Sequence, residues 1–120
     1  MRPKIEDAWF GSITVDGKRY EHDIIIRLSG KVRRRNKQLS KAVYGTSHII
    51  SLAEIKEMYR KRAEGIIIGT GQGGEVRLSP EAEKFLAEKK CPAHLAPTPI
   101  AIEDWNEAEG RILGLFHVTC

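Results

Sequence analysis

The sequence of 120 residues has little cysteine, few side-chain amides and no long apolar run. Its two cysteines, Cys91 and Cys120, lack the CxxC spacing of metal and redox motifs, so we expect reduced thiols. No apolar run approaches the roughly 20 residues of a membrane-spanning helix. The N-terminal segment MRPKIEDAWF contains no apolar core of a signal peptide, which predicts a cytoplasmic protein without a membrane partner. Asn and Gln occur only twice each, as is typical of heat-adapted proteins.

Recognisable metal-ligand and nucleophile patterns are missing too. The four histidines show no spacing such as H-x-x-x-H (His22, His48, His94 and His117). His117 and Cys120 are an odd number of residues apart, so on one extended strand they would point to opposite faces and could not pair. We therefore predict no metal and no catalytic residue. Pairing of Cys120 with a histidine from elsewhere stays open.

A glycine-rich segment follows the run Ile66–Ile68. Gly69, Gly71 and Gly74 match the G-x-G-x-x-G spacing of dinucleotide-binding turns. In those turns the last glycine opens a helix that receives the pyrophosphate, whereas GEVRLS follows here and no helix begins before Ser79. We predict a turn whose glycines allow positive φ and close chain approach, with no bound cofactor. Contact of an anion with the turn amides is the alternative.

Positive charge is concentrated in one segment. The net charge is +4, but residues 27–41 hold seven basic side chains and no acidic one, which leaves 13 basic and 16 acidic residues elsewhere. Such a run can contact an acidic protein or nucleic acid, although it carries no aromatic side chain for base stacking. It can also be a solvated strand edge. The candidate contact residues are Lys31, Arg33, Arg34, Arg35, Lys37 and Lys41.

The first third of the chain predicts a β-meander. Alternating side chains in FGSITV and an extended YEHDIIIRL flank Asp16-Gly17, a strong hairpin signal. Ser29-Gly30 predicts a second turn before KVRR, so three to four strands are expected. Residues 36–50 show neither helical nor strand periodicity, which predicts a long ordered loop.

The remaining two thirds alternate helices with strands. Ser51 and Glu54 form a capping-box pattern before a helix over 52–62, and Ser79-Pro80 and Thr98-Pro99 resemble further helix starts. Apolar strands are expected at 66–68 and 112–118, with short ones at 75–78 and 92–96. The order predicts one α/β domain over residues 1–120: three layers, in which the meander joins a central mixed sheet with flanking helices.

Five signatures occur together in the order FGSITVDGKRYEHDIII, YGTSH, IIIGTGQ, APTPIAIEDWNE and FHVTC. In this combination the sequence resembles the small adipogenesis-associated Mth-domain family, and its archaeal members most closely. The resemblance spans about Ile5 to Cys120. It implies a three-layer α/β domain without an assigned activity, substrate or cofactor. The family includes a mitochondrial assembly factor for respiratory complex I, which implies a role in interaction or assembly.

Two functions are compatible with these patterns. The favoured one is a non-enzymatic interaction or assembly domain that contacts an unidentified protein through residues 31–41, with self-association through exposed strands also compatible. The alternative is a small-ligand-binding protein or enzyme whose pocket joins the 44–48 loop, the 69–72 turn and the C-terminal strand. The dense polar groups of YGTSH suit such a site, but they equally suit a loop that hydrogen-bonds its own backbone. The candidate pocket residues are Tyr44, Thr46, Ser47, His48, Gly69, Thr70, Gly71, Gln72 and Cys120.

Overall fold

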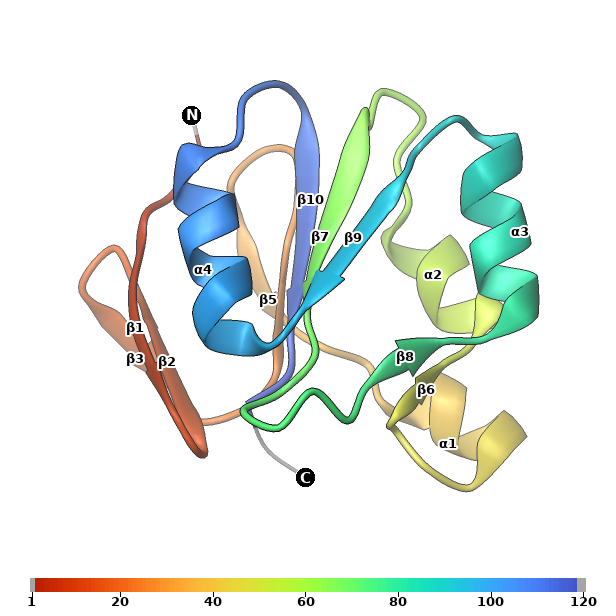
Figure 1. Cartoon of the computed structure of the whole chain (residues 1–120), viewed down its shortest axis with the longest axis horizontal. Helices are drawn as coiled ribbons and strands as arrows, with labels where there is room; N and C mark the ends of the chain where they lie inside the picture. The colour runs from red at the N-terminus through yellow and green to blue at the C-terminus, as the bar shows by residue number, and fades with distance from the viewer. Residues whose placement is uncertain (1, 119–120) are drawn as a thin grey trace.

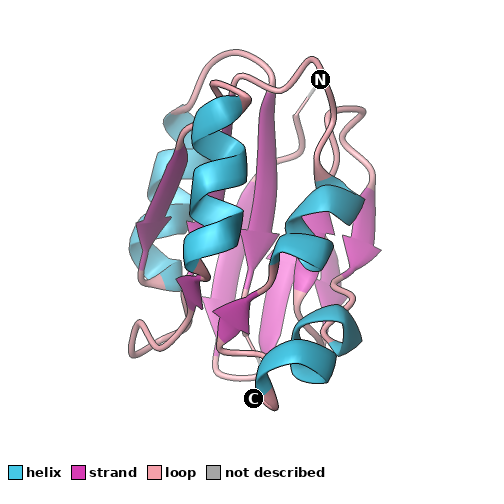
Figure 2. Ribbon diagram, turned by 90° about the vertical axis from the view of Figure 1, so that its right-hand side faces the viewer, coloured by secondary structure: helices cyan, strands magenta, loops and turns pink. Residues whose placement is uncertain are grey.

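The computed structural model describes residues 2–118, which form ten strands and four helices in three layers (Figure 1). A five-stranded sheet is the middle layer. Helix α4 (Thr98–Glu107) and a small sheet cover one of its faces, and helices α2 (Leu52–Met58) and α3 (Pro80–Glu88) cover the other (Figure 2). The predicted three-layer α/β class is confirmed.

The small sheet is the predicted N-terminal meander. It contains β1 (Ile5–Trp9), β2 (Ser12–Val15) and β3 (Lys18–Tyr20), all antiparallel. Asp16 and Gly17 join β2 to β3 with φ angles of 47° and 81°. Two consecutive positive φ angles are what a two-residue hairpin of type I′ requires, so this turn is confirmed.

The central sheet has the order β5-β4-β10-β7-β9. Its strands are β4 (Ile24–Ile26), β5 (Val32–Arg34), β7 (Gly65–Gly69), β9 (Ala93–Ala96) and β10 (Ile112–Phe116). Strand β10 pairs antiparallel with β4 and parallel with β7, which makes the sheet mixed. All five residues of β7 are buried because an apolar core lies against each face of the sheet.

Helices α2 and α3 begin where the sequence predicts. The Ser51 and Ser79 hydroxyls accept the N–H groups of Glu54 and Ala82, each three residues into its helix. The predicted end of α2 at residue 62 is wrong, because Tyr59 is already extended (φ −60°, ψ 140°). Within residues 2–118, no helix has the length and apolar character needed to cross a bilayer.

The N-terminus of α4 also differs from the prediction. Thr98 lies inside the first turn, Pro97 precedes the helix, and no side chain caps it. The hydroxyl of Thr98 instead donates to the carbonyl oxygen of His117 at 3.0 Å and accepts the N–H of Gly71 at 2.9 Å. Thr98 therefore joins the glycine turn to the end of β10.

Residues 36–50 are not the predicted long loop. They contain helix α1 (Gln38–Tyr44) and strand β6 (Ile49–Ile50), which pairs with β8 (Arg77–Leu78). Helix α1 shows no apolar stripe because the residue that it buries is Ser40, and Val43 is exposed. The local signal for it is a C-terminal one, since Gly45 ends the helix with a φ of 70°.

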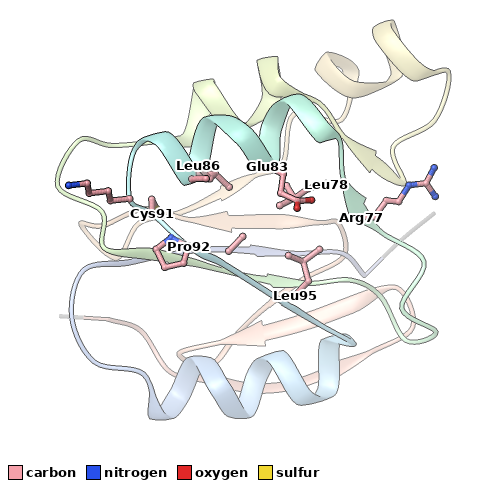
Figure 3. A pocket seen from close by; sticks show the side chains of 10 residues that line it. Arg77, Leu78, Glu83, Leu86, Cys91, Pro92 and Leu95 are labelled. Atoms are coloured by element: carbon pink, nitrogen blue, oxygen red, sulfur yellow. The ribbon is translucent and has the colours of Figure 1, made fainter.

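An apolar cleft of about 560 Å³ lies between α3 and β9 (Figure 3). Leu86 of α3 and Leu95 of β9 both line it, with Arg77 at one end and Cys91 and Pro92 at the other. We call this cleft the β9 groove.

Candidate functional site

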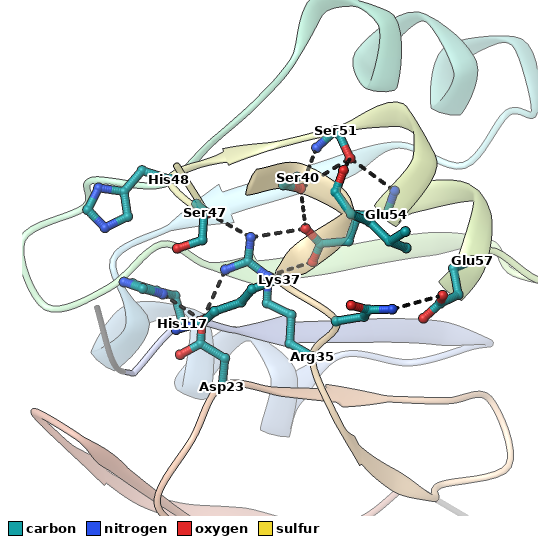
Figure 4. Close-up of polar contacts among 12 residues, drawn as sticks. Asp23, Arg35, Lys37, Ser40, Ser47, His48, Ser51, Glu54, Glu57 and His117 are labelled. Carbon is teal, nitrogen blue, oxygen red and sulfur yellow. Dashed lines mark hydrogen bonds and ion pairs between the residues drawn. The ribbon is translucent and has the colours of Figure 1, made fainter. Parts of the chain in front are cut away.

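A buried guanidinium is the centre of a polar cluster beside the end of β10 (Figure 4). Arg35 is 3% exposed. Its Nε donates to Glu54 Oε2 at 2.5 Å, its Nη1 to Asp23 Oδ2 at 3.0 Å, and its Nη2 to the Ser47 carbonyl oxygen at 2.7 Å. Burial by itself lowers the pKa of Arg35, but the hydrogen bond to Glu54 and the charges of Glu54 and Asp23 outweigh it and raise the pKa. The side chain is therefore a permanent buried cation.

Asp23 connects this cation to the C-terminal strand. Its Oδ1 accepts the N–H of Val118 at 2.7 Å, and its Oδ2 lies 2.7 Å from Nδ1 of His117. Nζ of Lys37 lies 3.5 Å from the same Oδ2. An Asp–His pair is an arrangement that enzymes use for general-base chemistry, but both side chains are almost fully buried here. The direct role of this pair is to fix the end of β10 against β4.

Glu54 connects the cation to helices α1 and α2. The capping box is confirmed only in part, because the Glu54 carboxylate does not return to the N–H of Ser51. That N–H donates to Ser40 Oγ at 2.9 Å, and Ser40 Oγ donates to Glu54 Oε1. We call this group of residues the Arg35 cluster. It contains Asp23, Arg35, Glu54 and His117, together with the contacting serines Ser40, Ser47 and Ser51.

The predicted pocket segments do come together at His117. The His48 ring packs edge-to-face on the His117 ring with centroids 5.3 Å apart, and a Cβ on Gly71 would lie 2.9 Å from Cδ2 of His117. The loop also bonds to itself, since Thr46 Oγ1 accepts the N–H of His48 at 3.1 Å. Tyr44 extends away and its hydroxyl donates to Glu81.

Most of the predicted pocket residues are therefore occupied by contacts within the protein. Ser47, Gly69, Thr70 and Gly71 are buried, Gln72 is exposed on the turn, and Cys120 lies outside the described residues.

Three backbone amides of the glycine turn donate to groups within the protein. The N–H groups of Thr70 and Gly71 bond to Ala96 and Thr98, and the N–H of Gly74 bonds to Gly71. No helix starts at Gly73; the next one, α3, begins at residue 80, as predicted. The Glu75 carboxylate lies within 3.1 Å of where a Cβ on Gly71 would be, so a negative charge sits over the turn. This geometry disfavours a phosphate there.

The basic segment is divided by the fold. Arg35 was predicted to belong to a contact surface, and its burial shows that this is wrong. Lys31, Arg33, Arg34 and Lys41 are exposed and Lys37 is half-buried, and we call these five residues the basic face. Arg33 and Arg34 belong to β5 and Lys41 to α1. Three of the five residues, Arg34, Lys37 and Lys41, line a polar cleft of about 410 Å³.

The sequence analysis missed an exposed aromatic turn. Trp9 at the end of β1 and Phe10 in the turn to β2 are 72% and 73% exposed. The next residue, Gly11, donates its N–H to the carbonyl oxygen of Val118 at 2.7 Å, and the Val118 N–H donates to Asp23. Since Asp23 lines the polar cleft, these hydrogen bonds connect the aromatic turn to that cleft.

The Arg35 cluster was also missed, apart from the histidine noted in HVTC. Asp23 lies between the largely exposed strand β3 and the isoleucine triplet of β4, and Glu54 lies in the first turn of α2. Neither charged residue has a local sequence pattern that marks it as buried. Within residues 2–118, no group of three or more His, Cys, Asp or Glu side chains is placed to hold a metal ion.

Comparison with known proteins identifies the family to which the chain belongs. A sequence profile described as "Protein of unknown function (DUF498/DUF598)" matches residues 5–116. The chain belongs to the DUF498/DUF598 family. The conserved hypothetical protein PH1505 from Pyrococcus horikoshii OT3 is 36% identical, with a TM-score of 0.90 over 98% of this chain and 99% of that one. A protein named MT938 is 34% identical, with a TM-score of 0.83 over 98% of this chain and 99% of that one.

The fold extends to bacteria. A protein from Bordetella pertussis, described as a Mth938-like domain, is 17% identical, with a TM-score of 0.62 over 97% of this chain and 85% of that one. The predicted Mth-type family is therefore confirmed, and the matches support the archaeal-like character of the chain. None of these descriptions attaches an adipogenesis or complex I role to the family.

Proposed function

We propose that this protein is a non-enzymatic interaction domain that binds an acidic segment of a partner protein through the basic face. The observation that carries the proposal is a set of exposed cations without counter-charges. Within residues 2–118, Lys31, Arg33, Arg34 and Lys41 form no ion pair, whereas the buried Arg35 of the same segment has two carboxylates. Unpaired cations beside a polar cleft attract an anionic partner.

The exposed aromatic turn favours a protein over a nucleic acid. Trp and Arg are the residues that most often dominate protein–protein binding energies, and the side chains of Trp9 and Phe10 are largely exposed. Five cations without interleaved aromatic side chains make a weak platform for single-stranded nucleic acid. The assembly role implied by the family resemblance belongs to the same class of function.

A ligand site at the 44–48 loop and the 69–72 turn is the less favoured alternative. Ser47, Thr70 and Gly71 are buried in contacts with other protein groups, and the clefts lined by basic and by apolar residues both lie elsewhere. The Asp23–His117 pair is likewise enclosed.

The test is capture of partners from a nuclease-treated extract of a related archaeon. The variant reverses three cations of the basic face, Arg33→Glu, Arg34→Glu and Lys41→Glu. Its matched control reverses three exposed lysines on other surfaces, Lys4→Glu, Lys61→Glu and Lys84→Glu, so that both proteins have the same net charge. We expect the wild type and the control to retain the same acidic proteins at moderate salt, and the basic-face variant to lose them.

Each outcome decides the proposal. If both triple variants lose capture equally, net charge and not the basic face governs binding. If both retain it equally, the basic face is not the interface. Loss of all capture after nuclease treatment would replace the protein partner by nucleic acid. The double variant Trp9→Ala and Phe10→Ala should capture the partners more weakly than the wild type does, with the same dependence on salt.

A further inference from the structure

Strand β9 is an open edge of the central sheet, and it forms one wall of the β9 groove. The N–H of Ile66 bonds to the carbonyl of Pro92 and the N–H of Thr70 bonds to the carbonyl of Ala96, so the even-numbered residues of this segment face β7. Alternation along a strand then directs the N–H and C=O groups of Ala93 and Leu95 away from β7. Both residues line the groove.

The other edge of the sheet is protected, and β9 is not. Strand β5 has only three residues, two of them arginines, and Nη1 of Arg33 donates to the outward carbonyl of Val32 at 3.3 Å. Charged side chains of this kind deter strand addition. The sequence of β9 is Ala-His-Leu-Ala, and its histidine turns to the opposite face, where Nε2 lies 2.7 Å from Asp104. No charged side chain of β9 therefore guards its edge.

The opposite wall of the groove is apolar and helical. Leu86 of α3 faces the groove, and Cys91 at its end is fully buried (Figure 3). A strand edge beside a helix, with apolar side chains between them, is the arrangement by which several peptide-binding domains add an extended segment to their sheet. Backbone hydrogen bonds then hold the segment, and alternate apolar side chains enter the groove.

The charges at the groove indicate what kind of segment fits. Its charged lining residues are Arg77, Lys90 and Glu83, which leaves one net positive charge. Within residues 2–118, neither basic side chain has an ion-pair or hydrogen-bond partner. A second copy of β9 would bring no acidic residue, so self-pairing leaves these cations unmatched.

We propose that the β9 groove binds an extended segment of a partner polypeptide as an added strand, with apolar residues at alternate positions and an acidic residue beside Arg77 or Lys90. This site is separate from the basic face and does not depend on it. Its ligand is recognised by backbone pairing at Ala93 and Leu95, and the apolar wall provides specificity for side chains.

The test uses a phage-displayed library of random nonapeptides, selected on the full-length protein, with the enriched peptides then synthesised. Ala93→Pro removes one outward N–H and fills its place with a ring, while the ladder to β7 keeps its bonds. Ala93→Ser is the matched control that keeps the N–H. Ala87→Trp fills the groove from α3 without touching the sheet, so the test does not rest on one variant.

We expect the enriched peptides to share alternating apolar residues with an acidic residue, and to bind the wild type and Ala93→Ser equally. Both blocking variants should weaken binding by roughly tenfold or more, and hydrogen exchange at the Leu95 amide should slow when a peptide binds. The proposal is overturned if no peptide is enriched, or if the peptides bind both blocking variants as tightly as the wild type.

Two further measurements exclude other occupants. Analytical ultracentrifugation of the wild type and of Ala93→Pro asks whether a second copy fills the groove, and a dimer that this substitution dissociates would overturn the proposal. Titration with dodecanoate asks whether the groove holds a small apolar acid. Binding of dodecanoate that Ala87→Trp abolishes and Ala93→Pro leaves unchanged would overturn it as well.

Discussion

Replacement of Arg35 by methionine tests whether the Arg35 cluster holds the three layers together. Methionine keeps the unbranched apolar part of the side chain but cannot donate a hydrogen bond. Glu54 would lose two hydrogen bonds, at 2.5 and 3.1 Å, and Asp23 would lose one, at 3.0 Å, while both carboxylates stay buried. Removing one partner from a buried ion pair typically costs about 3–5 kcal/mol, and a domain has only about 5–15 kcal/mol of stability.

Urea unfolding followed by circular dichroism measures this loss. We expect Arg35→Met to lower the free energy of unfolding by about 3–5 kcal/mol at neutral pH. Arg35→Lys should lie between the two proteins, since one ammonium group cannot reproduce the forked contacts of the guanidinium with Glu54 and Ser47.

A rescue variant separates the charge effect from the packing effect. Adding Asp23→Asn and Glu54→Gln to Arg35→Met removes the buried charges, so much of the lost stability should return. A loss below about 1 kcal/mol for Arg35→Met would refute the reasoning, because it would mean that the cluster behaves like an exposed ion pair.

Two further predictions concern single positions. Gly71→Ala should lower the free energy of unfolding in urea by about 1–3 kcal/mol, because residue 71 has a φ of 103° and its new Cβ would lie 2.9 Å from His117. Gly45→Ala is the control, with a φ of 70° and nothing within 4 Å, and it should lower the free energy less. Equal losses for the two variants would contradict the argument from the His117 contact. Burial raises the pKa of Cys91, so alkylation by iodoacetamide at about pH 8.5, followed by peptide mass spectrometry, should be roughly tenfold or more slower in the folded than in the urea-unfolded protein. Because burial raises the pKa of Cys91, the folded state should lose stability as the pH rises above the ordinary pKa of a thiol. Fast alkylation of the folded protein would show that the β9 groove opens.

The elements that the sequence predicts are those with local causes. The turn at 16–17 follows from two residues that tolerate positive φ, and the start of α3 follows from Ser79 and Pro80. The burial of β7 follows from an isoleucine triplet that a parallel sheet covers on both faces. In each case the residues that determine the structure are neighbours in the chain.

The elements that it misses depend on distant partners. Helix α1 has no apolar stripe, and its buried residue Ser40 is held by hydrogen bonds to Ser51 and Glu54. Thr98 has the sequence of a helix cap, but its hydroxyl is used by Gly71 and His117, which are 27 and 19 residues away. Propensity and periodicity carry no information about such contacts.

The basic segment shows the same limit for the candidate site. Arg33, Arg34 and Arg35 are consecutive and chemically identical, and alternation alone would place Arg33 and Arg35 on one face. Arg35 follows the last residue of β5, and its side chain enters the protein because Asp23 and Glu54 are buried nearby. Only the positions of these two carboxylates distinguish a structural arginine from the two that face solvent.

The buried arginine also explains how the surface residues are positioned. Asp23 accepts a hydrogen bond from the guanidinium and another from the N–H of Val118. The carbonyl oxygen of Val118 in turn accepts the N–H of Gly11, in the aromatic turn. One short chain of bonds thus links β5, the end of β10 and the turn between β1 and β2. Because that chain includes a buried ion pair, the basic face and the aromatic turn are held at fixed positions relative to each other. A surface fixed in this way loses little conformational entropy when a partner binds, which suits it for recognition.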